Sequence, residues 1–130
     1  MPTVAVIDDS KFLRITEERL LTRAGYLVVS ASDGQEALAL IHNTSPDLIV
    51  LDMVLPILTG TQVLERLKAD PATVHIPVIV VSGLSQKDQQ TSRDDGAAAF
   101  LDKEHLLDHE HGLIHVVEEL LKTAKTSAHT

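Results

Sequence analysis

Short apolar runs recur along the chain and predict buried β-strands. The run from Leu48 to Leu51 is too short for a helix and is bounded by Pro46 and Pro56, so it is typical of a fully buried strand. Four other runs are also short, apolar and followed by polar or turn-forming residues. The five predicted strands cover residues 3–7, 26–31, 48–51, 77–81 and 97–101.

The stretches between these runs predict five helices. Ser10 is the expected N-cap of the first helix, Gly25 is its expected stop, and Ser32 and Gln35 have the spacing of a capping box for the second. The segment 85–95 has no large apolar side chain, so a helix there would be weakly anchored. The predicted helices cover residues 11–24, 32–43, 58–69 and 85–95 and a last helix around Leu113, Ile114, Val117, Leu120 and Leu121, with a frayed end at 122–130. The expected inner face of the first helix consists of Leu13, Thr16, Leu20 and Ala24.

Five buried strands that alternate with five helices predict an α/β fold with a doubly wound parallel sheet covered on both faces. Right-handed crossovers and the length of the chain favour the flavodoxin-like strand order 2-1-3-4-5. In such a sheet the ligand site lies at the carboxyl ends of the strands, where the winding reverses between strands 1 and 3.

Composition limits the possible functions. The 130 residues are 44% hydrophobic, enough for one globular core and too few for two full domains. A net charge of −8 argues against a nucleic-acid partner, and the absence of cysteine excludes disulfides and Cys-based zinc sites. There is no apolar run of about 18 residues and no signal peptide, so we expect a cytoplasmic protein without a membrane partner.

Polar residues follow four of the predicted strands: Asp8 and Asp9, Asp52, Ser82 and Lys103. Each alone could be a helix cap, a turn or a solvated side chain, but all of them would meet at one edge of the sheet. Three carboxylates packed together either raise one another's pKa or hold a divalent cation. Oxygen ligands at an open edge favour Mg²⁺, and a lysine ammonium is suited to a phosphoryl group.

This constellation resembles the receiver domain of two-component response regulators. The resemblance covers about residues 3–122, and its combined motif is highly specific. The matching residues are Asp8-Asp9, Asp52, Pro56, Gly60, Ser82-Gly83 and Phe100-Leu101-Asp102-Lys103. One departure is Glu104, which stands where receivers usually have proline.

By that resemblance, Asp52 is the phosphoacceptor, which attacks a phosphohistidine on a histidine kinase or a histidine phosphotransfer protein. Asp9, Asp52 and the backbone carbonyl of Val54 would coordinate Mg²⁺, and Asp8 would act largely through water. Such a protein catalyses only its own phosphorylation and dephosphorylation, so we do not expect an enzyme with a separate substrate.

The resemblance also implies how the signal is made and transmitted. Lys103 and the Ser82 hydroxyl would neutralise charge on the phosphoryl oxygens, and Ser82 and Phe100 would act as switch residues. A downstream protein would bind the surface of helix 4, strand 5 and helix 5. Phe12 and Ile15, on or near the outer side of the first helix, are candidate anchors for the phosphodonor protein.

We expect residues 1–125 to form one receiver domain and 126–130 a flexible tail, with no output domain. A stand-alone regulator is favoured, and a receiver excised from a hybrid kinase or a multidomain regulator is the alternative. Two other classes fit less well. A flavodoxin-like flavin-binding protein would need a phosphate loop where Asp8 and Asp9 stand. A Mg²⁺-dependent aspartyl phosphatase would need its nucleophile after the first strand, with a second acid two residues on.

Overall fold

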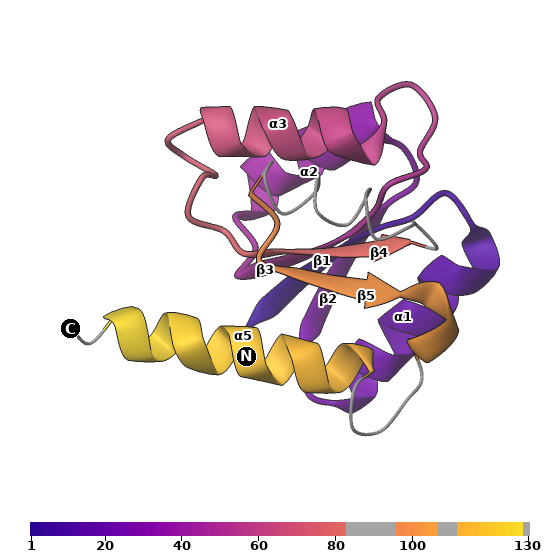
Figure 1. The fold of residues 1–130 in the computed structure, drawn as a ribbon. Coiled ribbons are helices and arrows are strands. Elements are labelled where there is room, and N and C mark those ends of the chain that lie inside the picture. The colour runs from indigo at the N-terminus through magenta and orange to yellow at the C-terminus, as the bar shows by residue number, and fades with distance from the viewer. Residues whose placement is uncertain (83–95, 107–111, 129–130) are drawn as a thin grey trace.

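A computed structural model of the chain describes residues 1–82, 96–106 and 112–128. Its centre is a five-stranded parallel sheet in the order β2-β1-β3-β4-β5, with helices on both faces (Figure 1). The predicted strand order is therefore confirmed. The strands are β1 (Thr3–Ile7), β2 (Leu27–Ala31), β3 (Leu48–Asp52), β4 (Val78–Ser82) and β5 (Ala99–Asp102).

The described residues contain four α-helices rather than the five that we predicted, because the segment 85–95 lies outside them. None of the described helices is long and apolar enough to cross a lipid bilayer. The last helix continues through residues that we expected to fray, in a segment without Gly or Pro to stop it. The helices are α1 (Lys11–Arg23), α2 (Gly34–Thr44), α3 (Gly60–Ala69), α5 (Leu113–Ala128) and a 3₁₀ turn, η1 (Lys103–His105).

Alternate residues of the central strands pack into two separate apolar layers. In β1, Ala5 and Ile7 contribute to the layer under α2 and α3, whereas Val4 and Val6 contribute to the layer under α1 and α5 (Figure 1). The strand β3 is buried along its whole length, as the uninterrupted apolar run predicted. Burial on both faces leaves the ends of the strands as the place where polar groups can gather.

The helix caps agree only in part with the sequence pattern. The Ser10 side chain accepts the Leu13 N–H at 3.3 Å, as predicted for α1. The capping box predicted at Ser32 is wrong: the N-cap of α2 is Asp33, which is extended and accepts the Glu36 N–H at 2.7 Å. Asp and Ser are comparable caps, so spacing alone could not separate two adjacent candidates.

The predicted inner face of α1 is wrong, because the helix turns a neighbouring stripe of residues toward the core. Leu13, Thr16 and Leu20 are only partly buried and Ala24 is exposed, whereas the buried residues of the helix are Glu17 and Leu21. A carboxyl group therefore occupies a position where an apolar side chain is usual.

Ile57 is held in a strained conformation in the loop between β3 and α3. Its φ is 70°, and the Leu58 N–H donates to the Pro56 carbonyl at 2.8 Å, which closes a γ-turn centred on Ile57. A β-branched residue with positive φ is a steric outlier, and the Ile57 side chain is 70% exposed, so burial does not offset the strain.

Ile57→Asn should therefore stabilise the fold, by about 1 kcal/mol, because asparagine adopts positive φ more readily than a β-branched residue does. Urea denaturation of the variant and wild type measures the difference. Val74→Asn is the control, since Val74 is an exposed loop residue without positive φ. An Ile57 variant that is less stable than wild type would show that the turn is not strained.

Candidate functional site

Three aspartates meet at the carboxyl edge of the sheet, at the junction of β1 and β3. Ile7 of β1 is level with Leu51 of β3, so the residues that follow each of them emerge side by side. One carboxylate oxygen from each of Asp8, Asp9 and Asp52 lies within 4.8 Å of the others. The predicted convergence of these acids is present in the structure.

The three carboxylates differ in their access to water. Asp8 is 1% exposed and Asp52 is 2% exposed, whereas Asp9 faces solvent. Burial raises the pKa of Asp8 to about 6; the Ser10 N–H, which donates to Asp8 Oδ1 at 2.9 Å, opposes this rise, and the nearby Asp52 adds to it. The site is thus a pair of buried acids with one exposed acid at its mouth.

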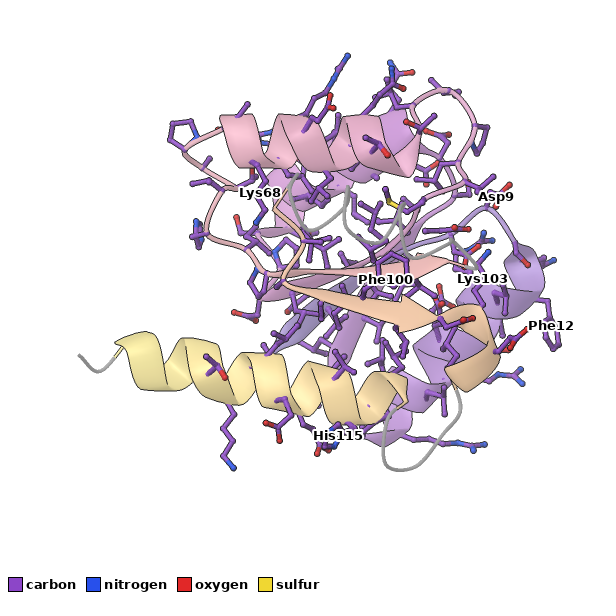
Figure 2. The ribbon with its side chains drawn as sticks, viewed as in Figure 1. Asp9, Phe12, Lys68, Phe100, Lys103 and His115 are labelled. Carbon is purple, nitrogen blue, oxygen red and sulfur yellow. The ribbon has the colours of Figure 1, made fainter. Side chains whose placement is uncertain are left out.

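Lys103 supplies the positive charge at the same edge. Pairing of β5 with β4 places Asp102 opposite Ser82, so the next residue, Lys103, reaches over the strand ends. Its Nζ lies 3.3 Å from Asp52 Oδ2, although these residues are far apart in sequence. Figure 2 shows Lys103 and Asp9 at the same end of the sheet.

The departure at Glu104 has a local explanation. Asp102 caps η1, and its Oδ1 accepts the Glu104 N–H at 3.0 Å. Proline at this position would have no N–H to donate. The turn that carries Lys103 is therefore held by a hydrogen bond that the usual family residue could not make.

The loop after Asp52 is shaped by two backbone contacts. The Val54 N–H donates to Asp52 Oδ1 at 3.1 Å, and the Gly60 N–H donates to the Met53 carbonyl at 3.0 Å. A side chain at position 60 would bring its Cβ within 2.4 Å of Met53 Cα, so only glycine fits there. Together these contacts fix the direction of the Asp52 carboxylate.

The two predicted switch residues lie at the expected places along the strands. Ser82 is the last residue of β4, but its side chain is outside the described part of the structure. Phe100 lies in β5 opposite Val80 and packs, half-buried, against the layer under α2 and α3 (Figure 2). Their roles in switching stay predictions.

Sequence reasoning missed Glu17, which is 1% exposed and has no hydrogen-bond partner for either carboxyl oxygen. Burial is the main cause that raises the pKa of Glu17 to about 8, and the negative charges of Asp8 and Asp52 add to it. The sequence pattern that indicates burial of Glu17 is the i, i+4 spacing of Leu13, Glu17 and Leu21, which places the acid on one stripe of the helix with two leucines.

The site residues fit a divalent cation. Asp8 Oδ2 is buried and has no hydrogen-bond partner, which is costly unless a ligand satisfies it. All three side chains offer oxygen, the ligand atom that Mg²⁺ prefers. Burial, with a smaller effect of the Asp52 charge, raises the pKa of Asp8, and a cation bound beside it would favour the ionised form.

A cavity of about 780 Å³ lies at the other end of the sheet, before the strands begin. Its lining includes Pro2, Tyr26, Pro46, Pro77 and Leu121. Its lining contains none of Asp8, Asp9, Asp52 and Lys103, so this cavity is separate from the acidic site at the opposite edge.

Comparisons with known proteins agree with this geometry. The sequence profile described as "Response regulator receiver domain" matches residues 4–122. The chain is 41% identical over 104 residues to the "Gliding motility regulatory protein" of Myxococcus xanthus, covering 79% of this chain and 13% of that protein. It is 33% identical over 102 residues to the "Polar-differentiation response regulator DivK" of Brucella anthropi, covering 78% of this chain and 83% of that one.

Solved structures show the same likeness. The signal receiver domain of a putative LuxO repressor protein from Vibrio parahaemolyticus superposes with a TM-score of 0.88 at 27% identity, covering 98% of this chain and 95% of that one. Several relatives are longer proteins: the chain spans 13% to 55% of the length of four of them.

Proposed function

This chain belongs to the response regulator receiver domain family, and from that membership we propose that it accepts a phosphoryl group onto Asp52 from a phosphohistidine. The donor is a histidine kinase or a histidine phosphotransfer protein. The product is a phosphoprotein that carries a 4-aspartylphosphate and signals in the cytoplasm, either as a stand-alone regulator or as part of a longer one.

The observation that carries the proposal is the 3.3 Å approach of Lys103 Nζ to Asp52 Oδ2, beside the carboxylates of Asp8 and Asp9. Phosphoryl transfer passes through a loose, in-line transition state, so a site mainly has to position groups and neutralise charge. In the transfer, an Asp52 oxygen bonds to phosphorus as the phosphorus–nitrogen bond to the donor imidazole breaks. Lys103 is placed to neutralise charge on the phosphoryl oxygens.

Mg²⁺ would be held by Asp9, Asp52 and the backbone carbonyl of Val54, with Asp8 acting through water. The bound ion supplies positive charge to the phosphoryl oxygens. Burial of Asp8 and Asp52 strengthens every charge interaction there, because few water molecules screen it. Asp52 Oδ1 accepts the backbone Val54 N–H, and Oδ2 accepts the mobile Lys103 ammonium, so we assign the attack to Oδ2, on the side where Lys103 can turn to the phosphoryl group.

The signal would leave the site through the switch residues. Ser82 would move toward the phosphoryl group and Phe100 would turn inward, which would alter the surface that the family resemblance assigns to helix 4, β5 and α5, helix 4 lying outside the described residues. A downstream protein would recognise that altered surface. The half-buried position of Phe100 supports this role, since a side chain between two environments has room to move either way.

Phe12 is a candidate anchor for the phosphodonor protein. Its side chain is 78% exposed on the first turn of α1, near the mouth of the site (Figure 2). Phe12→Asp should slow phosphotransfer from a histidine kinase that phosphorylates the wild type by about 10-fold or more, and leave phosphorylation by acetyl phosphate unchanged. Leu27→Asp, an exposed leucine at the other end of the sheet, is the matched control. An equal decrease in the rate of phosphotransfer in both variants would exclude a docking role for Phe12.

The proposed function is tested by incubating the protein with acetyl phosphate, with Mg²⁺ or with excess EDTA. We expect intact-mass spectrometry to show a gain of one phosphoryl group with Mg²⁺ and none with EDTA. A protein that gains no mass with Mg²⁺, while its circular dichroism spectrum is that of a folded α/β protein, would refute the proposal.

A further inference from the structure

Glu17 is a buried carboxyl group that phosphoryl transfer does not use. It lies in the middle of α1, one turn before Leu21, which is packed in the apolar layer shared by α1 and α5. At 1% exposure it is almost wholly shielded from bulk water, and neither oxygen has a hydrogen-bond partner. A carboxylate in such a place is costly, so the protonated form is favoured until a positive charge arrives nearby.

The charges that act on Glu17 are those of the phosphorylation site. Asp8, at the end of β1, and Asp52, at the end of β3, disfavour its ionised form, whereas Lys103 favours it. On α1 itself, the negative charge of Glu18 also disfavours the ionised form of Glu17, by a smaller amount. The Arg14 guanidinium on the same helix donates to the Asp8 carbonyl at 3.0 Å. The strand β2 carries no titratable side chain, and the described titratable residues of α5 are exposed: His115, Glu118, Glu119 and Lys122.

We propose that Glu17 is a proton-holding residue of the cation site, which releases its proton to solvent when a divalent cation binds beside Asp8 and Asp52 and regains it when the cation leaves. This inference rests on the proposed function, because it needs a cation at the three aspartates. A bound cation would offset the negative charge that keeps Glu17 protonated. By thermodynamic linkage, ionised Glu17 would in turn strengthen cation binding.

Burial and the lack of a hydrogen-bond partner hold the proton on Glu17 in the metal-free protein. A proton that the wild type releases on cation binding, and that Glu17→Gln does not release, is therefore assigned to Glu17. Glu17 is a positioning residue in this scheme, since it acts on the site through charge and does not touch the substrate.

The test is calorimetric titration of the metal-free protein with Mg²⁺ at about pH 7.5, in two buffers that differ in heat of ionisation. The difference between the two heats counts the protons released. We expect the wild type to release roughly half a proton or more per ion bound, and Glu17→Gln to release close to none. Glu18→Gln is the control on the same helix and should release as many protons as the wild type.

Equal proton release by the wild type and Glu17→Gln would overturn the inference while leaving the cation site intact. Absence of Mg²⁺ binding by the wild type would overturn both the inference and the proposed function. The wild type provides a second measurement if Glu17→Gln does not fold: the ¹³C shift of the Glu17 carboxyl, followed during Mg²⁺ addition at the same pH. We expect it to move toward the ionised position, and an unmoved shift would contradict the proposal.

Discussion

Asp52→Asn is expected to abolish phosphorylation by acetyl phosphate, with a rate at least about 10³-fold below that of the wild type. The amide of asparagine keeps the shape of the side chain but lacks the carboxylate that attacks phosphorus. It also removes the charge that Lys103 faces at 3.3 Å. The measurement is the time course of phosphoryl gain in intact-mass spectra with Mg²⁺ present.

Asp102→Asn is the matched control for this loss. Asp102 is an acid at the same edge of the sheet, but its Oδ1 caps η1 by accepting the Glu104 N–H, which an asparagine oxygen also accepts. We expect this variant to gain the phosphoryl group within about 3-fold of the wild-type rate. Phosphorylation of Asp52→Asn at the control's rate would show that the acceptor is another residue.

Glu17→Leu is expected to raise the free energy of unfolding by about 2–4 kcal/mol at pH 8. The substitution replaces a buried carboxyl group that has no hydrogen-bond partner with an apolar side chain of similar size. This gain in the free energy of unfolding depends on pH. Because the folded state raises the pKa of Glu17 to about 8, the folded wild type binds a proton that the unfolded chain has lost, and its stability falls as pH rises toward 8.

The raised pKa of Asp8, about 6, causes a similar fall in stability at lower pH. Most of that fall has occurred once the pH is well above 6. Between about pH 6 and pH 8, Glu17 is therefore expected to lower the stability of the metal-free protein as pH rises, and Glu17→Leu should lack this part of the decline. Urea denaturation of both proteins at the two pH values measures the difference. Parallel pH dependence in wild type and variant would mean that Glu17 does not titrate in this range.

The sheet and its acidic edge could be predicted because few physical alternatives exist for the sequence pattern. Short β-branched runs such as Leu48 to Leu51 cannot be stable helices, and parallel strands must place their carboxyl ends at one edge. Once Asp8, Asp9, Asp52 and Lys103 were assigned to strand ends, their proximity followed from the strand order alone.

The features that could not be predicted depend on contacts between elements. The face of α1 that turns inward is set by packing against the sheet and α5, so the stripe that contains Glu17 was only one of several possible inner faces in a helix with leucines on several sides. The conformation of Ile57 belongs to the turn closed by the Leu58 N–H and the Pro56 carbonyl, which overrides the preference of a β-branched residue. The choice of Asp33 over Ser32 as a cap depends on where the chain leaves β2.

Reduction of the phosphorylated protein with borohydride tests most directly whether Asp52 carries the phosphoryl group. Borohydride converts an aspartyl phosphate to homoserine, which peptide mass spectrometry locates. After incubation with acetyl phosphate and Mg²⁺, we expect homoserine at position 52 and aspartate at positions 8 and 9. Homoserine at any other aspartate, or a phosphoryl group that survives reduction on a serine or histidine, would contradict Asp52 as the phosphoacceptor.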